Sequence, residues 1–109
     1  MVKPSGHYAL WLEEEVQDAR KVLPGNVRQR MKRALENLST NPRPAGSKIL
    51  DTGDLDIPEG IELRRLRLEN WRLVYAVNSA DKWVWALGIR KRPPYDYQDL
   101  GKLAARLRW

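Results

Sequence analysis

The chain has 109 residues, with 20 basic side chains, 14 acidic side chains, a net charge of +6 and no cysteine. A domain of this length buries roughly 60–70% of the surface that its unfolded chain exposes, so we expect one domain over residues 1–109 with a modest core. The lack of cysteine excludes a disulfide framework and thiolate chemistry, and the apolar runs are too short for a membrane span or a signal peptide, which favours a soluble cytoplasmic protein.

The chain opens with a strand pattern that runs directly into a helix pattern. Residues 8–12 are short, apolar and aromatic, as in a buried strand. Glu13, Glu14 and Glu15 follow. Negative charges are stabilising at the N-terminus of a helix, where the positive end of the helix dipole lies. Apolar residues then recur at helical spacing up to Leu23, which predicts a first helix.

A second helix is predicted after the break at Pro24-Gly25-Asn26. Its apolar stripe consists of Val27, Met31, Leu35 and Leu38. The stripe stops at Asn41-Pro42, where proline cannot continue a helix. Two helices joined by a short break predict an antiparallel hairpin.

Residues 47–60 are predicted to form a loop rich in acidic residues. The carboxylates are those of Asp51, Asp54, Asp56 and Glu59. Their spacing lacks the alternating ligands and closing glutamate of a calcium loop, so we interpret the segment as a solvated acidic loop and expect no metal.

The hydrophobic period changes to two at Ile61, as in a strand. In Arg65-Leu66-Arg67-Leu68 the two leucines lie on one face and the two arginines on the other. Ile61 and Leu63 are out of phase with the later leucines, which predicts a bulge or a late strand start near Arg64.

Two more strands are predicted over residues 71–77 and 83–89, joined by a hairpin turn at residues 78–81. In both strands every second residue is large, and these residues are predicted to face the helix hairpin: Trp71, Leu73, Tyr75, Val77, Trp83, Trp85, Leu87 and Ile89. We interpret the aromatic residues among them as core rather than as a platform for base stacking. Arg72 and Arg90 then point the other way, over small residues that leave that face of the sheet open.

Apolar residues at helical spacing predict a C-terminal helix that begins near Asp96 or Asp99 and extends to Leu107. The predicted fold class is therefore α+β: an N-terminal strand, an antiparallel helix hairpin, a three-stranded antiparallel meander and a C-terminal helix. Helices are expected on one face of the antiparallel sheet and arginines on the other.

The charge of the chain is concentrated in the predicted sheet. Residues 64–92 hold eight basic and two acidic side chains, while the rest of the chain balances at twelve of each. A focused cationic site suits a polyphosphate, most directly nucleic acid. This basic stretch holds no histidine pair and no carboxylate pair, which argues against a histidine-based or metal-dependent nuclease.

The sequence resembles the RelE/ParE toxin superfamily of type II toxin–antitoxin systems. The likeness lies in Arg65-Leu66-Arg67-Leu68, in Trp71-Arg72-Leu73-Val74-Tyr75 and in Leu87-Gly88-Ile89-Arg90-Lys91-Arg92 followed by a tyrosine. It extends to the opening strand, the helix hairpin and the Asn41-Pro42 stop, and it covers about residues 8–97. The retained basic residues favour the RelE-like branch.

The resemblance implies a ribosome-dependent messenger-RNA endoribonuclease that inhibits translation without a metal or cofactor. The implied reaction is attack by a ribose 2′-hydroxyl on the adjacent phosphate. Arg72 would hold that phosphate, Arg90 or Arg92 would neutralise its developing charge, and Arg65 and Arg67 would bind neighbouring phosphates or assist proton transfer. Tyr97 or Tyr95 would stack on a base or take part in proton transfer. Further contacts to nucleic acid would come from Arg64, Lys91, Arg30 and Arg33.

The resemblance also implies partners: the ribosomal A site with its messenger RNA, and a RelB-like or other antitoxin in a hetero-oligomer that binds operator DNA through the antitoxin. Some family members have lysines where Arg65 and Arg67 stand, and arginine is a poor base near pH 7, so the general base is unassigned. A ParE-like inhibitor of DNA gyrase and a non-catalytic RNA-binding module remain alternative hypotheses. The basic residues of the second helix fit a contact to ribosomal RNA or a solvated helix face equally well.

Overall fold

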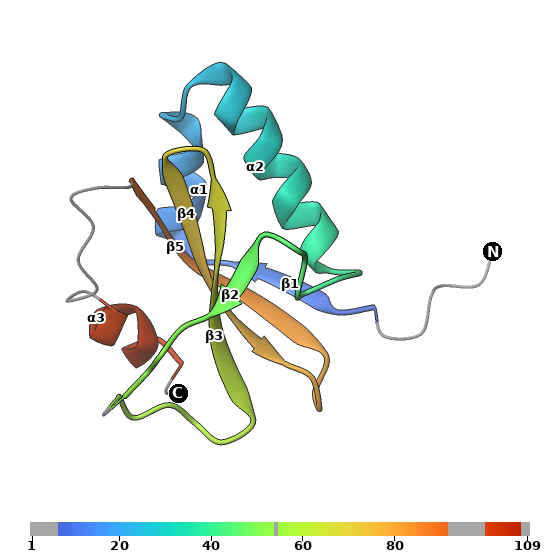
Figure 1. Ribbon diagram of the computed structural model, residues 1–109, viewed down its shortest axis with the longest axis vertical. Coiled ribbons are helices and arrows are strands. Elements are labelled where there is room, and N and C mark those ends of the chain that lie inside the picture. Colours follow the sequence, from blue (N-terminus) through green and yellow to red (C-terminus); the bar gives the residue numbers. More distant parts are fainter. Residues whose placement is uncertain (1–6, 54, 92–99, 108–109) are drawn as a thin grey trace.

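The computed structural model describes residues 7–53, 55–91 and 100–107, which form a five-stranded sheet with helices on both faces. Figure 1 shows the hairpin of the first two helices on one side of the sheet and the last helix on the other. In chain order the elements are β1 (Ala9–Leu12), α1 (Glu14–Lys21), α2 (Gly25–Leu38), β2 (Ser47–Ile49), β3 (Ile61–Leu68), β4 (Trp71–Asn78), β5 (Trp83–Lys91) and α3 (Leu100–Ala105).

The strands are ordered β1-β5-β4-β3-β2, and this order corrects two expectations. β1 pairs with β5 in parallel, so the sheet is mixed and only its other pairings are antiparallel. The segment predicted as a loop from residue 47 begins instead with a three-residue strand, β2, which pairs with β3 at Ser47 and Leu66. Three residues are too few to show a period of two, so only the pairing reveals this strand.

The hairpin packs on the face of the sheet that the sequence predicted. The apolar stripe of α2, from Val27 to Leu38, is buried in one cluster with sheet residues that include the fully buried Leu73 and Tyr75 of β4. Burial of one such side chain contributes about 1.5–3 kcal/mol. The Tyr75 hydroxyl donates a hydrogen bond of 2.7 Å to the Pro42 carbonyl, and burial raises the pKa of Tyr75 above its ordinary value. Tyr75 is therefore a core residue, as predicted.

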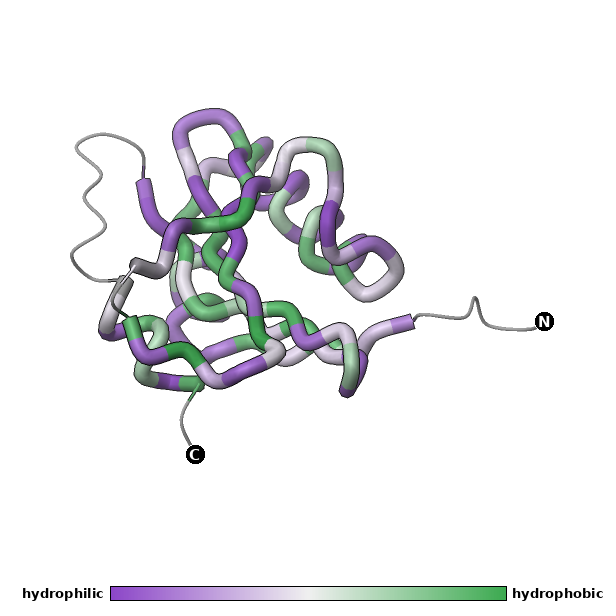
Figure 2. The backbone as a smooth tube through the Cα atoms, turned by 60° about the horizontal axis from the view of Figure 1, so that its bottom comes forward, coloured by the Kyte–Doolittle hydropathy of each residue, from purple (hydrophilic) through white to green (hydrophobic). Residues whose placement is uncertain are grey.

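The opposite face carries a second core beneath α3, which corrects the expectation of an open sheet. Leu103 and Leu107 are buried there against Leu63, Val74 and other sheet residues. Leu63 is out of phase with Leu66 because each leucine belongs to a different core, so no bulge is needed near Arg64. The pairing of β3 with β4 is continuous from Ile61 to Leu68. Figure 2 shows hydrophilic and hydrophobic residues following one another at short intervals along the backbone.

The bulge of this sheet lies in β5 instead. Tyr75 pairs with Ala86 and Val74 with Gly88, so Leu87 is the extra residue. In the part of β5 before the bulge, the large residues face the opposite side of the sheet from those after it. Trp83, Trp85 and Leu87 belong to the α3 core, whereas Ile89 belongs to the hairpin core. The prediction that all four face the hairpin is wrong for the first three, because alternation counts residues and cannot detect an inserted one.

No helix in the described part of the chain is long and apolar enough to cross a membrane.

Candidate functional site

Three arginines stand in one row across the sheet. Arg67 pairs directly with Arg72, and Arg72 pairs directly with Arg90. Directly opposite residues share a face, with Cβ atoms about 5 Å apart, so three neighbouring strands present three guanidinium groups over a span of about 10 Å. This direct pairing confirms the predicted common face of the arginines. The face is the one that carries α3, because Val74, two residues from Arg72, belongs to the core beneath that helix.

A second row adds one arginine and one lysine. Arg65 lies two residues before Arg67 on the same face and pairs with Lys48 of β2, whose side chain is exposed. Sequence reasoning missed Lys48 because the residue stands in the segment predicted as a loop. The five residues Lys48, Arg65, Arg67, Arg72 and Arg90 form what we call the sheet-face cluster.

The α3 core bounds the sheet-face cluster on one side. Arg65 pairs with Val74 and Arg72 precedes Val74 by two positions, and Val74 is fully buried under α3. The cationic groups therefore stand beside an apolar wall rather than on an evenly solvated surface. A low-dielectric wall focuses the field of neighbouring charges and strengthens their attraction for an anion.

Glu15 holds the Arg90 end of the row. Its carboxylate accepts a hydrogen bond of 2.9 Å from Arg90 and another of 2.9 Å from Arg106, which also donates to the Leu87 carbonyl. Burial raises the pKa of Glu15, but the hydrogen bonds from Arg106 and Arg90 outweigh it and hold the pKa below its ordinary value. The carboxylate that the sequence assigned to the helix dipole thus positions a candidate catalytic arginine.

Gly88 leaves the space in which this ion pair lies. A Cβ atom at position 88 would stand 2.6 Å from a carboxylate oxygen of Glu15 and 2.9 Å from Nη1 of Arg90. It would also approach Leu103 to 3.2 Å. The glycine two residues before Arg90 is therefore needed for close approach between the strand, the ion pair and α3.

Two of the predicted nucleic-acid contacts lie on the other face of the sheet. Arg64 pairs with Glu62 at 2.7 Å and is only 13% exposed, and the same carboxylate accepts a hydrogen bond of 2.7 Å from Arg43. The hydrogen bond from Arg43 is the largest cause that lowers the pKa of Glu62 below its ordinary value, and the hydrogen bond from Arg64 lowers it further. Lys91 pairs with Trp71 and its ammonium lies 6.0 Å from the centre of that ring, outside the sheet-face cluster.

The remaining predicted residues divide into two groups. Arg30 and Arg33 lie on α2, where Arg30 forms an ion pair of 2.9 Å with Glu69 and Arg33 is exposed. Three predicted site residues lie outside the described residues: Arg92, Tyr95 and Tyr97.

This arrangement can bind a phosphodiester and stabilise added negative charge on it. Guanidinium forks donate paired hydrogen bonds to phosphate oxygens, and donors fixed in advance need no rearrangement as charge develops. Arginine remains protonated near pH 7, so the arginines of the sheet-face cluster do not supply a general base.

The fold is similar to solved structures of RelE toxins. A chain of the archaeal RelE–RelB complex from Pyrococcus horikoshii aligns with a TM-score of 0.68 and 24% identity, over 82% of this chain and 99% of that one. A chain of the toxin–antitoxin complex RelBE2 from Mycobacterium tuberculosis aligns with a TM-score of 0.59 and 19% identity, over 78% and 98%. The isolated E. coli RelE toxin aligns with a TM-score of 0.54 and 22% identity, over 92% and 98%.

No family model matches the sequence, and no curated protein matches it either. The structural likeness establishes the fold: this chain has the fold of the RelE toxins.

Proposed function

We propose that this protein is the toxin of a toxin–antitoxin pair and an endoribonuclease that cleaves messenger RNA on the ribosome. The observation that carries the proposal is the row of Arg67, Arg72 and Arg90, held by the register of three strands on one face of a RelE-like fold. A phosphate site built from guanidinium groups suits cleavage that uses the RNA's own 2′-hydroxyl as nucleophile.

In the proposed reaction the 2′-oxygen attacks the adjacent phosphorus as it loses its proton. The bond from phosphorus to the 5′-oxygen breaks, and that oxygen takes up a proton, which leaves a 2′,3′-cyclic phosphate and a free 5′-hydroxyl. Arg72, at the centre of the row, holds the scissile phosphate, and Arg90 shares the extra negative charge of the pentavalent transition state. Arg65 and Arg67 bind neighbouring phosphates.

Dependence on the ribosome follows from the weakness of arginine as a base. A well-oriented intramolecular attack removes about 7–11 kcal/mol of barrier, whereas one general acid or base contributes roughly 10²–10⁴-fold in rate. A partner that bends the messenger into the attacking geometry therefore supplies more than a proton-transfer group does. We expect the ribosomal A site to act as this partner, with slow cleavage of free RNA.

An antitoxin is the second proposed partner. Two of the similar structures are complexes of a RelE-type toxin with its antitoxin. The acidic or amphipathic segment of such a protein would neutralise the sheet-face cluster. We propose that the two proteins meet in the cytoplasm, where the messenger is translated.

Primer extension on messenger RNA from cells that make this protein tests the proposal. We expect cuts at codon positions within translated regions, and Arg72→Gln should abolish them. Lys102→Gln is the matched control, because Lys102 is an exposed lysine of α3 and its loss removes the same charge. Cuts in untranslated RNA would contradict ribosome dependence, and intact messengers accompanied by DNA damage would favour a gyrase inhibitor.

A further inference from the structure

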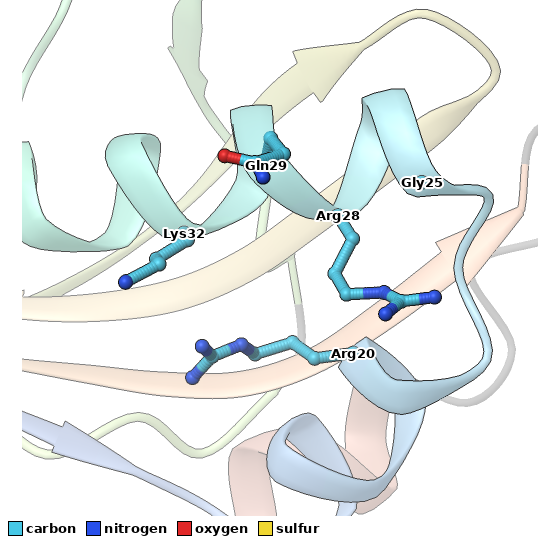
Figure 3. A pocket seen from close by; sticks show the side chains of 5 residues that line it. All are labelled: Arg20, Gly25, Arg28, Gln29 and Lys32. Atoms are coloured by element: carbon cyan, nitrogen blue, oxygen red, sulfur yellow. The ribbon is translucent and has the colours of Figure 1, made fainter.

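A cationic hollow lies between α1 and α2, on the helices that cover the other face of the sheet from the sheet-face cluster. It consists of two adjoining spaces of about 250 and 240 Å³ that share Arg20 and Arg28. Figure 3 shows both side chains in the space between the two helices, with Lys32 further along α2. We call this the hairpin pocket, and its lining residues are Gln17, Arg20, Lys21, Gly25, Arg28, Gln29 and Lys32.

The charge of the hairpin pocket is one-sided. Four of its lining residues are basic, and no acidic residue lines it in the described part of the chain. The neighbouring carboxylate of Asp18 lies 3.9 Å from the ammonium of Lys21, and both side chains are about 70% exposed or more. An exposed pair of this kind is weak, so it leaves most of the positive potential in place.

The hydrogen-bond donors of the pocket also point to an anion. Nε of Arg20 is buried and has no hydrogen-bond acceptor among the described residues. One Nη of Arg28 donates to the Leu23 carbonyl at 3.3 Å, which fixes this guanidinium at the start of α2. α2 begins after Pro24 without a side-chain cap and with no acidic residue in its first turn, so its amide groups and its dipole add positive potential here.

We propose that the hairpin pocket binds a backbone phosphate of RNA, at a second site separate from the sheet-face cluster. Guanidinium forks and helix amides together suit the several oxygens of a phosphate better than the two oxygens of a carboxylate. Lys21 and Lys32 extend the charge beyond the shared centre, as a polymer of phosphates requires. The two sites lie on different sides of the sheet, so the RNA that contacts the pocket is a large folded RNA rather than the cleaved segment.

The direct test follows the side-chain Nε–H signals of the arginines by NMR in the full chain. A short oligouridylate is added in one titration, inorganic phosphate in a second and polyglutamate in a third. We expect the Arg20 signal to move with the oligouridylate and, at higher concentration, with inorganic phosphate. An Arg20 signal that stays still with the oligouridylate, or that moves as strongly with polyglutamate, would overturn the proposal.

Variants give a second readout. Arg20→Gln combined with Arg28→Gln should weaken oligouridylate binding about tenfold at low salt and reduce the log–log salt slope by about 0.7, the value for one phosphate contact to a single strand. Lys102→Gln, an exposed change on α3 outside both sites, should leave the slope unchanged. Equal losses in both variants would mean a diffuse charge effect and contradict a pocket. If the double variant unfolds, the titration of the native chain decides.

The inference fails separately from the proposed function. Arg72→Gln should stop messenger cleavage and leave the response of Arg20 to the oligouridylate intact. A chain that cleaves nothing but still shifts the Arg20 signal would retain the second site without the nuclease.

Discussion

Arg64 and Arg65 are neighbours in β3, and the two faces of the sheet give them different roles. Arg64 lies on the hairpin side, where it shares the carboxylate of Glu62 with Arg43. Arg65 lies on the α3 side, beside Lys48 and next to the row of three arginines. The comparison teaches that an arginine whose charge is shared within one carboxylate network holds the fold together, whereas positive charges gathered in a row on one face are suited to an external anion even though Glu15 holds one of them, Arg90.

The largest expected effect is at Arg72, the centre of the row. Arg72→Gln should lower the cleavage rate by about 10²–10³-fold, because one preorganised donor to the developing charge is lost. Arg72→Lys should retain part of the rate, since it keeps the charge and loses the planar fork. Single-turnover cleavage on programmed ribosomes measures both. Equal rates for the two variants would mean that charge alone matters at this position.

The next effect is at Gly88, which leaves room for the ion pair between Glu15 and Arg90. Gly88→Ala should destabilise the fold by about 1–3 kcal/mol, because the added methyl group overlaps the space of the ion pair between Glu15 and Arg90. Urea denaturation measures the loss, and cleavage should fall with it as Arg90 is displaced. Gly46→Ala is the control, since a Cβ at position 46 meets Leu66 at an ordinary contact distance of 3.4 Å. Equal stability of the two variants would contradict this account of Gly88.

A smaller effect should separate Arg64 from Arg65. Arg64→Gln removes a charged hydrogen bond to Glu62, which should cost on the order of 1–3 kcal/mol of unfolding free energy, while the rate of the folded fraction stays unchanged. Arg65→Gln should do the reverse and weaken RNA binding with little loss of stability. Thermal unfolding and binding assays on the same two variants measure this exchange. If Arg64→Gln and Arg65→Gln both lost stability, or both lost RNA binding, the two faces of the sheet would not have the different roles described here.

The smallest effect is the pH dependence of stability. The pKa values of Glu15 and Glu62 are lowered in the folded chain, so their stabilising contribution is complete above the unfolded pKa of about 4.3 and is lost as the pH falls through the lower folded values. Glu15→Gln should therefore flatten the decline of stability below that pH. Urea midpoints measured between neutral and acidic pH provide the check, and parallel curves for the variant and the parent would contradict it.

Several features of this fold could be predicted from local sequence. The apolar spacing of α2 identified its buried face, and the alternation in β4 identified both the core position of Tyr75 and the outward position of Arg72. The common face of Arg65 and Arg67 followed in the same way. Side-chain facing within a regular element depends only on its period, so a single stretch of sequence carries it.

The tertiary structure decided what depends on distant parts of the chain. The parallel pairing of β1 with β5, the bulge at Leu87 and the seating of α3 on the arginine face each depend on contacts between remote segments. The same holds for the carboxylate of Glu15, which reaches Arg90 across 75 positions of sequence. Local periodicity sets the direction of a side chain, but its neighbours are set by the free energy of packing the whole chain.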